Sequence, residues 1–171
     1  MMLEDVNPSR YPPGVEEARK FCVWVDADAC PGAVKDMVVR ACLKHSVDAV
    51  FVANKDIQLP SSPHLKAIRV PKGPDVVDAY IAEQGRSGDL AITQDIPLAA
   101  QLVARGVATI SPYGETFTDD SVGERLSIRN FMHDLREEGV RTSGPAPFGP
   151  VQRQRFANAF DRILSRARRG G

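Results

Sequence analysis

The strongest constraint on the fold is an alternation between short apolar runs and segments with helical spacing, extending from residue 21 to residue 110. The first run, residues 21–25, reads Phe-Cys-Val-Trp-Val without a polar residue. Continuous apolar runs of this length are typical of strands covered on both faces of a parallel sheet. Helical segments between such strands provide the crossovers, so the pattern predicts an α/β fold.

The pattern places five strands and the helices between them. Strands are expected at residues 21–25, 47–53, 65–70, 89–93 and 107–110. Helices are expected after Pro31, over residues 76–84 and over residues 97–104, where apolar residues recur at helical spacing. Beyond residue 120, Ser121 and Glu124 fit a capping box. The helix that follows carries an apolar stripe of Ile128, Phe131, Met132 and Leu135, and a last helix carries Phe156, Phe160, Ile163 and Leu164.

The length of 171 residues suits one domain. We expect a flexible leader at residues 1–19, a single domain at 20–166 whose C-terminal helical segment is 121–166, and a flexible tail at 167–171. No apolar run approaches the ~18 residues of a membrane span, and the N-terminus lacks the apolar core of a secretory signal. Three irregularly spaced cysteines indicate reduced thiols. These features predict a cytoplasmic protein without membrane contact.

The net charge is zero but unevenly distributed. Residues 1–120 carry 12 basic and 17 acidic residues, whereas residues 121–171 carry 10 basic and 5 acidic ones. All ten basic residues of the second part are arginines, whose planar fork suits phosphate oxygens. The pattern fits an Arg-bearing segment that faces a polyanion, and equally a solvated helix face.

Acidic residues follow the predicted strands at one edge of the sheet. Asp26 and Asp28 come directly after the first strand, and Asp95 follows the fourth. Asp75 and Asp78 are three residues apart and share one helix face. In open α/β sheets, sites lie at the carboxyl ends of strands where the strand order reverses. Converging carboxylates repel one another unless one takes up a proton or a hard cation binds, so the cluster predicts Mg²⁺ or Mn²⁺.

Simpler explanations exist for most of these residues. Asp28, Asp75 and Asp95 each precede a helix and can act as caps. Asp26 is harder to explain, because an acid that ends a fully apolar strand gains nothing from burial. Thr93 could place its hydroxyl on a phosphate or water, or be an ordinary strand threonine.

Two other residues near the predicted strands are weaker candidates. Asp89 opens a strand at the opposite edge and is interpreted as a turn residue. Cys30 lies at a helix start, where the helix dipole lowers a thiol pKa, but the neighbouring carboxylates raise it again.

The chain resembles the YaiI/YqxD family, an uncharacterised bacterial family with a PIN-like domain. The similarity covers about residues 21–166, and its two longest motifs are Trp24–Pro31 and Gly88–Ala99. Shorter matches are Val52–Asn54, Gly73–Asp78, Ser111–Gly114, Glu124–Leu126, Arg129–Met132, Gly144–Pro145 and Arg153–Ala157. The resemblance implies a three-layer α/β/α PIN-like domain with a mostly parallel five-stranded sheet in the order 3-2-1-4-5 and additional C-terminal helices.

The resemblance also implies a function, because PIN-like domains are, as a class, Mg²⁺- or Mn²⁺-dependent nucleases. It implies that Asp26, Asp78 and Asp95 hold the cation. The residues expected to complete or support that ligand set are Asp28, Asp75 and Thr93. The residues expected to be catalytic are Asp26, Asp28, Asp78 and Asp95. The residues expected to contact backbone phosphates are Arg125, Arg129, Arg153 and Arg155. RNA is favoured over DNA as the substrate.

This sequence departs from the family pattern at Asn130 and Gln152, where acids are common, which argues against a role for those positions. Two alternative functions stay open. Asp26-x-Asp28 after an apolar strand also fits a haloacid-dehalogenase-type phosphatase, although no suitable later lysine and acid pair is present. The chain could also be a non-catalytic RNA-binding or adaptor protein whose acid cluster is structural.

Overall fold

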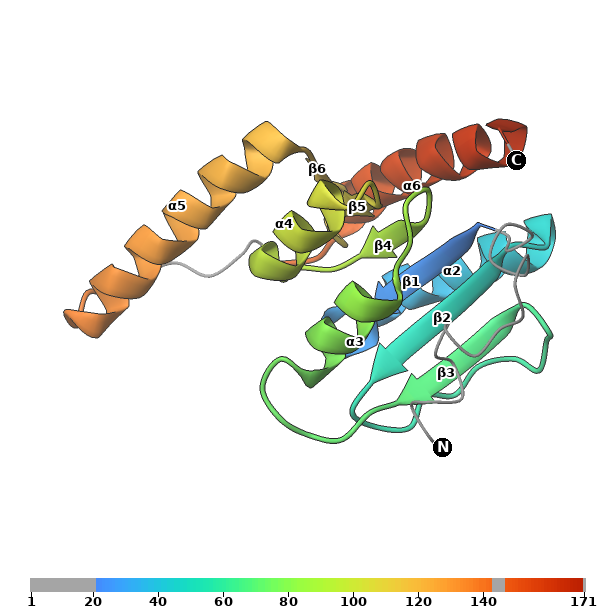
Figure 1. Cartoon of the computed structure of the whole chain (residues 1–171), viewed down its shortest axis with the longest axis horizontal. Coiled ribbons are helices and arrows are strands. Elements are labelled where there is room, and N and C mark those ends of the chain that lie inside the picture. The colour runs from blue at the N-terminus through green and yellow to red at the C-terminus, as the bar shows by residue number, and fades with distance from the viewer. Residues whose placement is uncertain (1–20, 143–146, 171) are drawn as a thin grey trace.

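A computed structural model describes residues 21–142 and 147–170, so the leader predicted at residues 1–19 lies outside the described residues (Figure 1). The described strands are β1 (Cys22–Asp26), β2 (Asp48–Ala53), β3 (Leu65–Arg69), β4 (Leu90–Ile92), β5 (Ala108–Ile110) and β6 (Thr116–Phe117). The helices are the short 3-10 turn η3 (Ala27–Ala29), α2 (Gly32–His45), α3 (Val76–Gln84), α4 (Ile96–Ala104), α5 (Asp119–Glu137) and α6 (Pro150–Gly170).

The strands form one mostly parallel sheet in the order β3-β2-β1-β4-β5-β6. The first five of these are parallel neighbours, and β6 pairs antiparallel with β5. The predicted α/β class and the central order are therefore confirmed. The sequence analysis did not predict β6, because two residues are too short for an alternation pattern to be recognised.

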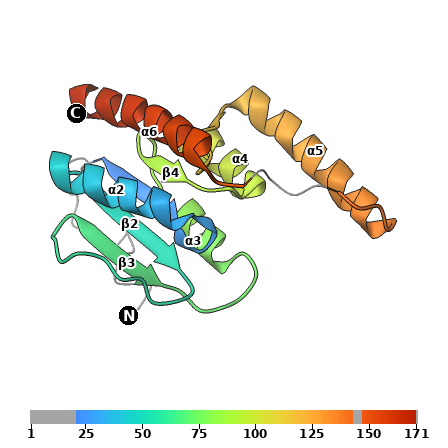
Figure 2. The ribbon, with the colours of Figure 1, turned by 180° about the vertical axis from the view of Figure 1, so that it is seen from behind.

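Helices cover both faces of the sheet. Figure 2 shows α2 and α6 side by side on one face, and their buried residues share a core with Val23 and Val25 of β1. On the other face, α3 and α4 pack against Cys22 and Trp24. Successive side chains of a strand point to opposite faces. Asp26, two residues after Trp24, therefore faces the layer of α3 and α4.

The C-terminal helices differ in how they pack. The predicted apolar face of α6 is confirmed, since Phe156 and Phe160 are buried and their rings stack at 5.4 Å between centroids. Helix α5 instead extends away from the sheet (Figure 1), and Phe131 is 60% exposed. Its buried residue, Val122, lies on the opposite side of the helix from Phe131 and packs with α4. Of the stripe predicted on α5, Ile128, Phe131 and Met132 are exposed and Leu135 is half-buried.

The predicted capping box of α5 is wrong in register. Thr118, which follows β6 directly, is the N-cap, and its Oγ1 accepts a hydrogen bond of 3.1 Å from the Ser121 backbone N–H. The Ser121 Oγ in turn accepts from the Thr118 N–H at 2.8 Å. Ser121 is therefore the third helical residue (N3), which completes the capping box, and Glu124 takes no part in it. The helix begins earlier than predicted because the chain leaves β6 in an extended conformation at Thr118.

At its other end, α6 continues to Gly170, so residues 167–170 of the predicted tail are helical. Among the described residues, no helix is both long and apolar enough to cross a membrane. The cytoplasmic location stays a prediction.

Candidate functional site

The centre of the site is a hydrogen bond between the ends of β1 and β4, which are parallel neighbours. Asp26 ends β1 and is only 6% exposed, while Thr93 follows β4 and is also buried. The Thr93 hydroxyl donates to Asp26 Oδ2 over 2.9 Å. The buried carboxylate thus has a partner, and its position is fixed by the sheet.

The same threonine connects Asp26 to Asp95. The Asp95 backbone N–H donates to Thr93 Oγ1 at 3.0 Å, and Asp95 Oδ1 accepts from the Leu98 N–H at 2.8 Å. Asp95 is therefore the N-cap of α4, as the structural explanation of this residue predicted. The cap uses only one oxygen of the Asp95 carboxylate, which also takes part in a side-chain hydrogen bond with Asp78.

Helix α3 brings two further acids to this edge. Asp75 lies at the N-cap in the left-handed conformation, with φ of 63°, and its side chain makes no capping hydrogen bond. Asp78 lies in the first turn of the helix. One carboxylate oxygen from each of Asp75, Asp78 and Asp95 lies within 4.8 Å of the others.

This group differs from the predicted ligand set of Asp26, Asp78 and Asp95. The structure brings Asp75 into the closest group, and Asp26 lies beside it as the partner of Thr93. Sequence reasoning gave Asp75 only a supporting role, because its position depends on a left-handed loop residue that spacing does not reveal.

The electrostatics of the site are those of uncompensated negative charge. Burial raises the pKa of Asp26, and the charges of Asp95 and Asp28 raise it further, against the Thr93 hydrogen bond that lowers it. Burial also raises the pKa of Asp78 to about 7, together with a hydrogen bond to Asp95 and the charges of Asp95, Asp26 and Asp75. Near neutral pH, the Asp78 carboxyl is therefore partly protonated.

No cation relieves this repulsion in the described part of the chain. None of the ion pairs between described residues involves Asp26, Asp75, Asp78 or Asp95. Close carboxylate oxygens without a basic partner are the donor set that Mg²⁺ and Mn²⁺ prefer. The residues present therefore fit a hard divalent cation.

Asp28 occupies a separate position. Its Oδ2 accepts a hydrogen bond of 2.8 Å from the Asn54 N–H, just after β2. Gln94, just after β4, donates from Nε2 to the Ala29 carbonyl at 2.8 Å. Asn54 and Gln94 hold the loop that carries Asp28, and sequence reasoning missed both roles. Their positions directly after strands of the same edge are the signal that could have found them.

Two residues near the first strand are poor candidates for chemistry. Burial raises the pKa of Cys30 to about 12, so the thiol stays protonated at neutral pH. Asp89 lies in a turn at the opposite edge, as predicted, but it is buried. It accepts hydrogen bonds from Trp24 Nε1 at 2.9 Å and from the Cys22 and Arg86 N–H groups at 3.1 Å each.

The four predicted phosphate-binding arginines lie on the two C-terminal helices. Arg125 of α5 pairs with Glu115 at 3.2 Å. Arg129, Arg153 and Arg155 are exposed. Arg155 contacts Gly114, which follows β5, so the first turns of α6 lie at the carboxyl end of that strand. Binding of nucleic acid to these arginines stays a prediction.

Comparison with known proteins identifies the family. Residues 24–166 match the model described as "Uncharacterized BCR, YaiI/YqxD family". The chain is 53% identical over 144 residues to a UPF0178 protein of Myxococcus xanthus, covering 84% of this chain and 94% of that protein. It is 46% identical over 155 residues to a UPF0178 protein of Xanthomonas campestris, covering 91% and 94%.

No solved structure matches the chain, so the PIN-like assignment stays a prediction. The family model spans most of the chain and includes every acid of the site from Asp26 to Asp95. The chain therefore belongs to the YaiI/YqxD family.

Proposed function

We propose that the protein is a Mg²⁺- or Mn²⁺-dependent nuclease that hydrolyses phosphodiester bonds, with RNA as the preferred substrate. The observation that carries the proposal is the group of Asp75, Asp78 and Asp95, whose carboxylate oxygens lie within 4.8 Å of one another without a basic partner in the described structure. A purely structural cluster of this kind would lose stability through mutual repulsion.

The residues that would hold the cation are Asp75, Asp78 and Asp95, with Asp26 beside them. A bound divalent ion supplies positive charge against the negative charge of a reacting phosphodiester. Thr93 keeps the Asp26 carboxylate in a fixed orientation, since its hydroxyl donates a hydrogen bond of 2.9 Å to one Asp26 oxygen. In the metal-free protein, partial protonation of Asp78 relieves part of the repulsion between these carboxylates, because the pKa of Asp78 is raised to about 7.

The proposal is tested first without a substrate. Isothermal titration of Mn²⁺ into the full chain should show a site that is lost in the double variant Asp78→Asn/Asp95→Asn. Asp161→Asn, an exposed acid on α6, is the matched control and should keep the site. Unchanged Mn²⁺ affinity in the double variant would rule out these acids as the ligands.

Activity is tested with labelled single-stranded RNA. We expect cleavage with Mn²⁺, none with chelator, and a loss of at least ~100-fold in Asp26→Asn, since removing one group that acts on transition-state charge typically has this effect. RNA binding whose affinity is unchanged by chelator, with no cleavage, would instead support the non-catalytic RNA-binding alternative.

A further inference from the structure

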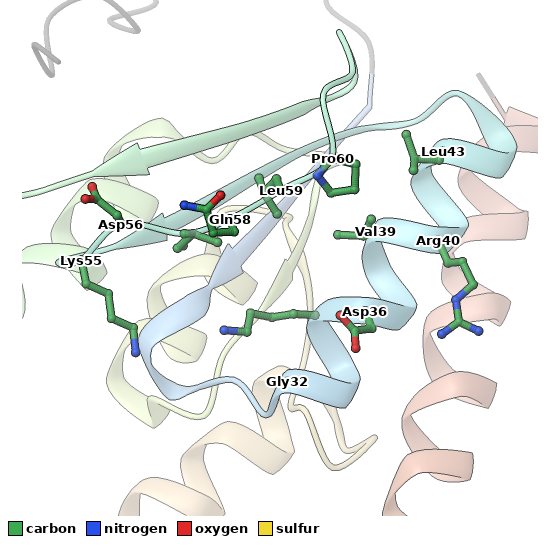
Figure 3. Close-up of a pocket in the computed structure, with 12 residues that line it drawn as sticks. Gly32, Asp36, Val39, Arg40, Leu43, Lys55, Asp56, Gln58, Leu59 and Pro60 are labelled. Carbon is green, nitrogen blue, oxygen red and sulfur yellow. The ribbon is translucent and has the colours of Figure 1, made fainter.

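A groove of about 670 Å³ lies between α2 and the loop that follows β2 (Figure 3). One wall is the outer side of α2 from Gly32 to Leu43, which spans ~16 Å at the rise of an α-helix. The other wall is the segment from Lys55 to Pro60. The groove lies on the α2 side of the sheet, and none of the residues that line it belongs to the acid cluster.

One end of the groove lies next to the chain segment that binds Asp28. Lys55 follows Asn54, whose backbone N–H holds the Asp28 carboxylate at 2.8 Å. Lys35, in the first turn of α2, lowers the pKa of Cys30 while Asp26 raises it, so that thiol is within electrostatic reach of both. Both lysines line the groove, and Lys55, which directly follows the residue that binds Asp28, lies at the end that we call its mouth.

The charges of the groove favour an anion at this mouth. In the described structure neither Lys35 nor Lys55 forms an ion pair, whereas Asp56 is paired with Arg69 at 3.2 Å. Asp36 and Arg40, one helical turn apart on α2, add one charge of each sign. Two ammonium groups without an ion pair in the described structure thus give the groove positive charge that attracts a polyanion.

The floor of the groove is apolar. Figure 3 shows Val39 of α2 and Leu59 of the loop pointing toward one another, with Leu43 and Pro60 above them. These side chains can cover the face of a sugar or base, and none of the described residues that line the groove is aromatic and able to stack on a base. Contacts with the backbone phosphates must then provide most of the affinity.

We infer that this groove binds a single-stranded nucleic acid, with Lys35 and Lys55 contacting the phosphates next to the one held at the acidic centre. The inference deepens the proposed nuclease function. It rests on that function for the phosphate that is held at the acidic centre. Because the contacts are to phosphate, binding should be tolerant of base sequence and sensitive to salt.

The test measures binding separately from cleavage. Fluorescence anisotropy follows labelled oligouridine and oligothymidine with the full chain in chelator, where no metal-dependent cleavage occurs. Lys35→Ala/Lys55→Ala should weaken binding of both roughly tenfold and reduce the slope of log affinity against log salt by about 1.4, the value for two phosphate contacts on a single strand.

The matched control is Lys44→Ala/Lys66→Ala, which removes the same charge from exposed lysines that do not line the groove. It should change affinity by less than about twofold. Lys55→Glu, at an exposed position, tests the same site if Lys35 proves necessary for folding. Equal losses in the two double variants, or equal competition by polyglutamate, would overturn the inference.

The two proposals fail in different ways. Lysine-dependent binding without any cleavage in Mn²⁺ would support the groove and refute the nuclease. Cleavage in Mn²⁺ that is unchanged in Lys35→Ala/Lys55→Ala would support the nuclease and refute the groove.

Discussion

The Thr93 hydroxyl donates one hydrogen bond to the buried Asp26 carboxylate and accepts another from the Asp95 backbone N–H. A single side chain thereby fixes one acid by its oxygen and the other by its backbone. Thr93 lies 67 residues from Asp26 in the sequence. The pairing of β1 with β4 brings the two residues together. The geometry of the candidate site therefore depends on the central sheet.

Replacement of Thr93 by valine should separate this role from simple packing, since the two side chains have nearly the same shape. We expect Thr93→Val to lower the free energy of unfolding by about 1–3 kcal/mol, because it leaves a buried carboxylate without its donor. Mn²⁺ affinity should fall several-fold as Asp26 loses its orientation.

Thr109→Val is the matched control, because Thr109 is equally buried and its hydroxyl binds only the Val107 carbonyl at 3.0 Å. Urea unfolding and Mn²⁺ titration of both variants give the answer. If both variants bind Mn²⁺ like the wild type, Thr93 has no role in orienting the site.

The edge of the sheet at which the acids meet could be predicted because parallel strands in a crossover fold end at the same side. Asp26 ends the buried strand β1, and Thr93 and Asp95 lie within three residues of the end of β4, so the pattern of apolar runs was sufficient to place them. The close approach of Asp75 could not be predicted in this way. It depends on a left-handed backbone at φ of 63°, which no periodicity encodes.

Helix α5 shows a second feature that could not be predicted from the sequence. The periodicity of Ile128, Phe131 and Met132 correctly predicts a helix with an apolar side, but periodicity does not state what covers that side. In the structure the body contacts α5 through Val122 and Leu126 instead. The register of the cap was also missed, because it depends on the end of the two-residue strand β6.

At the opposite edge of the sheet, Asp89 should act as a structural anchor. Its carboxylate accepts from Trp24 Nε1, the Cys22 N–H and the Arg86 N–H, and an asparagine in its place would turn an N–H₂ group toward at least one of these donors. We expect Asp89→Asn to lower the free energy of unfolding by about 1.5–3 kcal/mol.

The fluorescence of Trp24, the single tryptophan of the chain, reports this change directly. Its emission should shift in Asp89→Asn but stay unchanged in Asp56→Asn, which removes only the exposed pair with Arg69 and should cost less than about 1 kcal/mol. Mn²⁺ affinity should be retained in both variants. An Asp89→Asn protein as stable as Asp56→Asn would show that the carboxylate is not the anchor.

Gly114 allows α6 to approach the turn after β5. Its φ is +89°, and a Cβ atom there would lie 2.5 Å from the carbonyl carbon of Arg155. Gly114→Ala should therefore destabilise the protein by roughly 2–3 kcal/mol, through backbone strain and displacement of the helix. Gly123→Ala on α5 meets nothing within 4 Å and should instead stabilise by roughly 0.5–1 kcal/mol. Urea unfolding that gives both variants the same sign would contradict this account of α6 docking.

The raised pKa of Asp78 predicts how stability and metal binding depend on pH. The group has a pKa of about 7 in the folded protein and 3.8 as its ordinary value, so between these values the folded state binds more protons than the unfolded state. The metal-free protein should therefore lose stability as pH rises from about 4 through 7. Mn²⁺ affinity should change in the opposite direction, because the cation must displace the proton on Asp78.

The Asp78→Asn variant tests the pH dependence of stability and that of Mn²⁺ affinity together. Without the titrating carboxyl, the metal-free variant should be more stable than the wild type at pH 8 and its stability should vary less between pH 5 and pH 8, while Mn²⁺ affinity is lost. Asp161→Asn, on the exposed side of α6, should leave both pH profiles unchanged. Thermal unfolding and Mn²⁺ titration across this pH range decide the question: an Asp78→Asn protein that is less stable than the wild type at pH 8 would mean that the carboxylate contributes to folding rather than opposing it.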